Sequence, residues 1–134
     1  IGAMLATQEA AKGFDYGSHA STFGGNPLAA AAALETLKII SEPAFLEQVR
    51  EIGKYFKQKL LNLKEKHTRI TDVRGEGLLL GLEVDKDADF FVGELMKKGF
   101  ITNSIRNKVI RFAPPLIIEK ENIDRLIAVL DELF

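Results

Sequence analysis

Beyond residue 43, apolar residues recur at helical spacing in three stretches of the chain. The longest stretch runs from Ala44 to about His67, where apolar residues lie three and four positions apart and leave lysines and glutamates to solvent. A shorter helix is expected from Ala88 to Lys98, because Gly99 follows at the position that favours a helix end. A final amphipathic helix is expected after Pro114-Pro115, with apolar residues in register from Ile123 to Leu133.

Short apolar runs between these helices predict four strands. Ile70–Val73 and Leu78–Val84 flank the turn-forming segment Arg74–Gly77, and Phe100–Thr102 and Val109–Phe112 flank a polar turn. The order from residue 70 onward is therefore strand, strand, helix, strand, strand, helix. This order predicts a small α/β sandwich with helices on one face of a mainly antiparallel sheet.

The N-terminal part of the chain has a different pattern. Ile1 to Thr7 is predicted to be a short strand, and since the chain opens inside this element we expect it to belong to a longer protein. Residues 14–25 form a loop rich in Gly, Ser and Thr. An alanine-rich helix should follow, with Asn26 as its N-cap and Pro27 at its first position.

Composition and charge exclude several classes of function. The net charge is −1 and no basic patch is evident, which argues against binding to nucleic acid or an anionic membrane surface. There is no cysteine, so disulfides and thiolate metal sites are excluded, and a cytoplasmic setting is permitted. No apolar run reaches transmembrane length, and the two histidines have no carboxylate cluster beside them, so we expect no metal centre.

The first candidate site is the segment His19-Ala20-Ser21-Thr22-Phe23-Gly24-Gly25-Asn26-Pro27. It brings two hydroxyls, two glycines and a helix start together within a few residues. Such a turn can present N–H and O–H groups to one anion, usually a phosphate. The alternative is an ordinary loop in which the Ser21 and Thr22 hydroxyls bond nearby backbone groups.

Arg111 is the second candidate. It stands in a predicted strand with apolar neighbours on either side. A planar guanidinium beside an apolar pocket is suited to bidentate capture of a carboxylate. The alternative is an arginine on an edge strand that simply points to water.

Together these segments resemble class III pyridoxal-phosphate-dependent aminotransferases, most of all the acetylornithine/ornithine branch. The resemblance covers essentially the whole chain, and includes Asp72–Gly81 and Val109–Leu116 as well as the loop at His19–Pro27. It implies the C-terminal part of a fold-type I enzyme. Residues 1–42 would then be the end of the large cofactor-binding domain, and residues 43–134 a connecting helix and a small C-terminal α/β domain.

The resemblance also implies roles for individual residues. Thr22 would contact the phosphate of pyridoxal 5'-phosphate held by the partner subunit of a homodimer with shared active sites. Ser21 would lie beside both cofactor and substrate, and Arg111 would hold the α-carboxylate of the amino-acid or 2-oxo-acid substrate. No catalytic residue is expected in this chain, because the family places the Schiff-base lysine shortly before the Ile-Gly-Ala-Met segment at Ile1. Lys12, in Ala-Lys-Gly, is not that lysine, since no glycine-rich run follows it.

The activity implied for the parent protein is transfer of an amino group from N-acetylornithine, or a similar ω-amine, to 2-oxoglutarate in arginine biosynthesis. The chain by itself would be inactive, because it lacks the lysine. Within the enzyme class, 4-aminobutyrate transaminases, ornithine transaminases and glutamate-semialdehyde aminomutases are the alternatives. Outside it, the alternative is a stand-alone, non-catalytic α/β dimerisation or binding module.

Overall fold

The computed structural model describes residues 1–134, which divide into two compact units, Ile1–Phe45 and Leu46–Phe134. The first unit contains helices α1 (Gln8–Ala11) and α2 (Pro27–Ile40). Helix α3 (Pro43–Lys66) begins in the first unit and continues in the second. The assignment of residues 1–42 to the end of a large cofactor-binding domain stays a prediction.

Local sequence signals explain the start of α2. The side-chain oxygen of Asn26 accepts a hydrogen bond from the Ala29 N–H at 2.9 Å, and Pro27 occupies the first helical turn. The predicted capping arrangement is thereby confirmed. The strand predicted at Ile1–Thr7 is wrong, because all four strands of the sheet come from later in the chain and none of them pairs with this segment.

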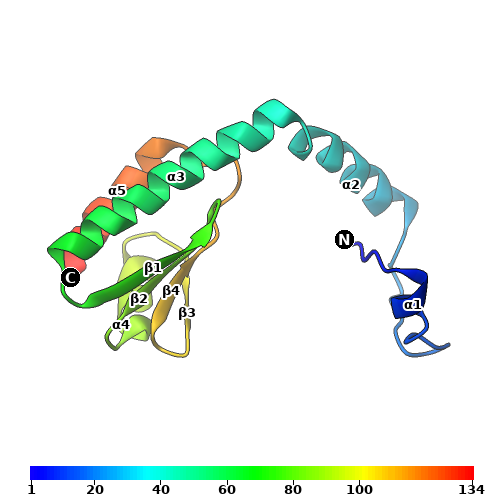
Figure 1. The fold of residues 1–134 in the computed structure, drawn as a ribbon, viewed down its shortest axis with the longest axis horizontal. Coiled ribbons are helices and arrows are strands. Elements are labelled where there is room, and N and C mark those ends of the chain that lie inside the picture. Colours follow the sequence, from blue (N-terminus) through cyan, green and yellow to red (C-terminus); the bar gives the residue numbers. More distant parts are fainter. The chain divides into compact units, whose positions relative to one another are not determined.

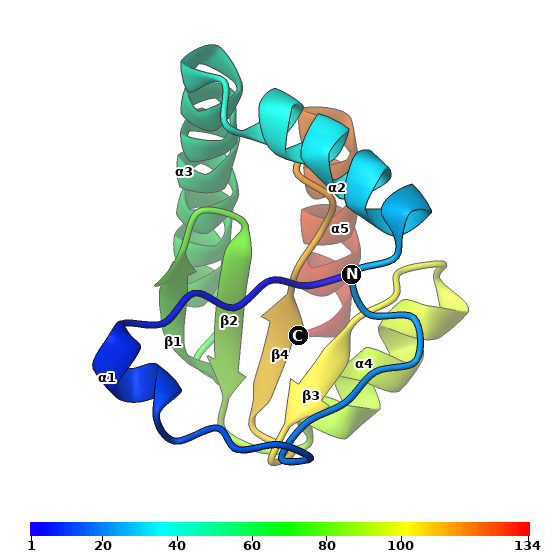
Figure 2. The same ribbon diagram turned by 90° about the vertical axis from the view of Figure 1, so that its right-hand side faces the viewer.

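The second unit is built on a four-stranded sheet. Its strands are β1 (Ile70–Glu76), β2 (Leu79–Val84), β3 (Asn103–Ile105) and β4 (Val109–Phe112). Figure 2 shows them in the order β1-β2-β4-β3, and every neighbouring pair is antiparallel. The predicted order of elements and the α/β class are confirmed.

Three helices cover one face of this sheet: α3, α4 (Ala88–Lys97) and α5 (Lys120–Leu133) (Figure 1). Alternate residues of β2 point into this layer, so that the helix-facing side chains of the strand are buried. Burial of such side chains is the main contribution to the stability of a domain of this size. The least exposed core residues are Phe56, Leu60, Leu80, Leu82, Val84, Ala88, Phe91, Leu95, Ile110, Ile123 and Leu130.

The structure corrects the predicted ends of two strands. β1 continues through Arg74 to Glu76, so the turn before β2 shrinks to Gly77-Leu78, where Gly77 has a left-handed φ of 56°. The third strand is Asn103–Ile105 and not Phe100–Thr102. The reason is the tight reversal after it, in which Arg106 and Asn107 have φ values of 52° and 51°. This reversal pairs Ile105 with Val109 and sets the register of the hairpin.

Candidate functional site

Two glycines shape the loop before α2. Gly25 has a φ of 68°, in the left-handed region that favours glycine. The Gly24 N–H donates to the Ser21 carbonyl oxygen at 3.3 Å, and a Cβ on Gly24 would lie only 3.1 Å from the Ser21 Cβ. A side chain at either glycine would therefore strain or crowd the turn that presents Ser21 and Thr22.

The two hydroxyls of this loop form no hydrogen bond within the chain. Asn26 differs, because its side-chain oxygen caps α2 and its side-chain nitrogen donates to the Phe23 carbonyl oxygen at 2.7 Å. The ordinary-loop alternative, in which the hydroxyls of Ser21 and Thr22 bond nearby backbone, is thus not the arrangement found. Ser21, Gly24 and Gly25 also line a hollow of the first unit, whereas Thr22 does not. Free hydroxyls beside a glycine turn and a helix start are groups that suit a phosphate.

Arg111 lies on the sheet face opposite the helices. Its strand, β4, is not at an edge, since β2 and β3 flank it, so the alternative interpretation is wrong about the position of the strand but agrees with the exposure of the side chain. The Arg111 side chain is exposed, and its Nε–H donates to the Oδ1 atom of Asn103 at 3.0 Å. Its two terminal nitrogens, Nη1 and Nη2, form no hydrogen bond or ion pair within the chain. They remain available for bidentate binding of a carboxylate.

A shallow groove of about 410 Å³ surrounds this guanidinium on the open face of the sheet. Gly81 of β2 is paired with Arg74 on one side and with Arg111 on the other. Because Gly81 has no side chain, Cγ1 of Val109 and Cγ of Arg74 can lie over it, 3.0 Å and 4.0 Å from where a Cβ would be. The lining also includes the apolar residues Leu79, Leu80, Ile105 and Val109, and Gly75 and Glu76 at the end of β1.

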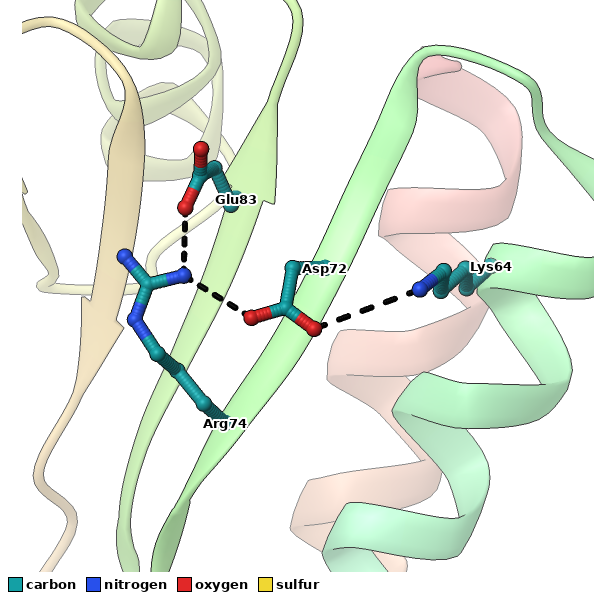
Figure 3. Close-up of polar contacts among 4 residues, drawn as sticks. All are labelled: Lys64, Asp72, Arg74 and Glu83. Atoms are coloured by element: carbon teal, nitrogen blue, oxygen red, sulfur yellow. Dashed lines mark hydrogen bonds and ion pairs between the residues drawn. The ribbon is translucent and has the colours of Figure 1, made fainter.

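Arg74, in the same groove, is already neutralised by carboxylates (Figure 3). Its Nη1 atom donates to Asp72 Oδ2 at 2.9 Å and to the carboxylate of Glu83, and the other oxygen of Asp72 is 4.0 Å from the Nζ atom of Lys64. The hydrogen bond from Arg74 lowers the pKa of Asp72, and the Glu83 and Asp72 carboxylates raise the pKa of Arg74. Of the two arginines in the groove, Arg111 therefore carries the charge that is free to bind an anion.

Lys12, the other residue that resembles part of a catalytic motif, has no feature of a catalytic residue in the structure. Lys12 is exposed and pairs with Glu9 one helical turn away, at 2.6 Å. No group of His, Asp and Glu side chains is placed to hold a metal ion. None of the helices has the length and apolar character needed to span a membrane.

Ser21 and Thr22 lie in the first unit and Arg111 lies in the second, so they form two separate candidate sites. Asn103 and Gly81 are the members of the second site that sequence reasoning missed. Asn103 is eight residues from Arg111 in the chain, and only the β3–β4 register places them opposite each other.

Comparison with known proteins identifies the family that shares these features. The model of the aminotransferase class-III family matches residues 1–134. The chain belongs to the class-III aminotransferase family. It is 48% identical over 134 residues to an acetylornithine aminotransferase of Methanocaldococcus jannaschii, with 100% of this chain and 34% of the relative covered. It is 45% identical to an acetylornithine aminotransferase of Caldanaerobacter subterraneus subsp. tengcongensis, with 99% of this chain and 34% of that relative covered.

The solved structures of class-III aminotransferases share the fold. An ornithine aminotransferase from Plasmodium yoelii superimposes with a TM-score of 0.79 at 31% identity, covering 96% of this chain and 35% of that one. The chain thus spans about a third of the length of the curated relatives it matches.

Proposed function

We propose that this chain works as the C-terminal part of a pyridoxal-phosphate-dependent aminotransferase that moves an amino group from N-acetylornithine, or a similar ω-amine, to 2-oxoglutarate. Its family membership and the acetylornithine aminotransferase names of the two relatives support this activity. When bound, pyridoxal phosphate would supply the electron sink for the exchange of amino groups. The role in arginine biosynthesis and a cytoplasmic location belong to the same proposal.

Arg111 is the observation that carries the proposal. 2-Oxoglutarate bears an α-carboxylate next to the reacting carbon, whereas an ω-amine such as N-acetylornithine reacts at the opposite end from its α-carboxylate. The guanidinium of Arg111 has both terminal nitrogens free, lies in a groove lined by apolar residues together with Arg74 and Glu76, and has no carboxylate partner in the chain. We assign it the binding of this carboxylate in 2-oxoglutarate and in the amino acid that forms from it.

Ser21 and Thr22 would hold the phosphate end of the cofactor. Their hydroxyls are unpaired, and the glycine turn lets a phosphate approach the backbone at the start of α2. Thr22 would reach the cofactor of the partner subunit in a homodimer with shared active sites, and Ser21 would also lie beside the substrate. In support of an interface here, the apolar side chains of Phe23 and Leu28, on either side of the glycine turn, are 80% and 83% exposed.

A panel of amino donors tests the proposal on the intact protein that contains this chain. We expect transamination of 2-oxoglutarate with N-acetylornithine as the preferred donor. Preference for 4-aminobutyrate or ornithine, with no use of N-acetylornithine, would transfer the assignment to those transaminases. Absence of transamination with every donor would favour the non-catalytic dimerisation or binding module.

A further inference from the structure

We propose that Asn103 is a positioning residue for Arg111, which orients the guanidinium toward a substrate carboxylate without neutralising it. The inference rests on the proposed function, since it takes Arg111 as the group that binds the carboxylate. It adds that a side chain of the neighbouring strand β3 orients the Arg111 guanidinium.

The β3–β4 ladder brings the two side chains together. Asn103 and Arg111 are directly paired residues of adjacent antiparallel strands, so their side chains emerge on the same face of the sheet. Asn103 Oδ1 accepts the Nε–H of Arg111 at 3.0 Å. A guanidinium is planar and rigid, so one hydrogen bond at Nε restrains the direction in which the two terminal nitrogens point. Asn103 thereby directs the free edge of Arg111 without occupying it.

The charge of the acceptor distinguishes Arg111 from its neighbour in the groove. Arg74 is oriented by the carboxylates of Asp72 and Glu83, which also cancel its charge. Arg111 is oriented by a neutral amide, so its positive charge is retained. A carboxylate at position 103 would form an ion pair with Arg111 and compete with the substrate.

Gly81 lies between Arg74 and Arg111 in the sheet. It is paired with both arginines, and a Cβ there would lie 4.0 Å from Cγ of Arg74. A Cβ on Gly81 would lie 3.0 Å from Cγ1 of Val109, in the wall of the same groove. In the row of paired residues Arg74, Gly81, Arg111 and Asn103, carboxylates neutralise the charge of Arg74 but not the charge of Arg111.

The test compares Asn103→Ala and Asn103→Asp with a matched control in the intact enzyme. The control is Asn62→Ala on α3, which also removes an exposed amide that accepts one hydrogen bond, there from Gln58 Nε2 at 2.9 Å. Steady-state kinetics give KM and kcat for 2-oxoglutarate, and inhibition by glutarate reports carboxylate binding without chemistry. Thermal unfolding of each variant monitors the fold.

For Asn103→Ala we expect the KM for 2-oxoglutarate and the inhibition constant of glutarate to rise about tenfold, with a much smaller change in kcat. Asn103→Asp should raise both constants further, although it keeps the hydrogen-bond acceptor. Asn62→Ala should behave as the wild type.

Two results would overturn the inference while leaving the proposed function intact: wild-type constants for Asn103→Ala, or wild-type constants for Asn103→Asp. In both cases an Arg111→Ala variant is measured in parallel, and its loss of carboxylate binding shows that the assay detects such a loss. A wild-type enzyme with no transaminase activity would remove the proposed function and this inference with it.

Discussion

Gly53 of α3 packs against Gly77 in the turn between β1 and β2, so closely that a Cβ on Gly53 would lie 2.6 Å from the Gly77 carbonyl oxygen. Gly53 is buried, and the atoms it would meet are backbone atoms that cannot rotate away. We therefore expect Gly53→Ala to lower the free energy of unfolding by about 1–3 kcal/mol through overpacking. Urea denaturation of the protein measures this loss.

Gly93→Ala is the matched control, because Gly93 also lies inside a helix, α4, but is exposed and has nothing within 4 Å of the added Cβ. Alanine is the better helix former, so this variant should gain about 0.5–1 kcal/mol. The packing argument fails if the two substitutions shift the unfolding midpoint in the same direction.

Thr22→Ala should weaken retention of pyridoxal phosphate by the intact enzyme. Loss of a hydrogen bond to a charged group costs about 1.5–3 kcal/mol, which corresponds to a rise of roughly tenfold or more in the dissociation constant of the cofactor. Thr22→Ser keeps the hydroxyl and should retain most of the affinity. Thr68→Ala, at an exposed position between α3 and β1, is the control. An absorbance titration with the cofactor measures the constants, and equal values for Thr22→Ala and the wild type would remove Thr22 from the phosphate site.

The Asp72–Arg74 pair makes stability depend on pH in a defined direction. The hydrogen bond from Arg74 lowers the pKa of Asp72 in the folded protein relative to its ordinary value. A carboxyl group of this kind adds stability that is fully present above its unfolded pKa, about 3.9, and is lost as the pH falls through its lowered folded pKa.

We therefore expect the difference in unfolding free energy between wild type and Asp72→Asn to be constant above about pH 5 and to shrink below about pH 4. The difference should be small, because both partners are about half exposed, and it should shrink further in high salt. Denaturation curves at several pH values measure it, and a difference that grows on acidification is the opposite of the expected sign.

Much of the fold could be predicted from the sequence because several signals are local. The start of α2 is determined by Asn26 and Pro27, which act within one helical turn. The end of α4 is determined in the same way by Gly99, whose φ is 87°. Apolar spacing predicted α3 and α5, since a helix must bury one side against the sheet.

The errors arose where contacts between distant residues decide the outcome. An apolar run such as Ile1–Thr7 forms a strand only beside a partner strand, and its sequence does not contain that partner. The position of β3 depends on the left-handed pair Arg106-Asn107, a conformation that asparagine adopts readily but that an arginine does not predict. The contact of Asn103 with Arg111 depends in turn on that register.

Arg111→Ala in the intact enzyme tests the central claim most directly, with Arg50→Ala, an exposed arginine of α3 paired to Glu47, as control. The measurement is the second-order rate constant of each half-reaction, with the amino donor and with 2-oxoglutarate. Because the carboxylate adjoins the reacting carbon only in 2-oxoglutarate, we expect the constant for 2-oxoglutarate to fall by about tenfold to a hundredfold and the constant for the ω-amine donor to fall less. A wild-type constant for the half-reaction with 2-oxoglutarate would contradict the assignment of Arg111 as the carboxylate-binding residue.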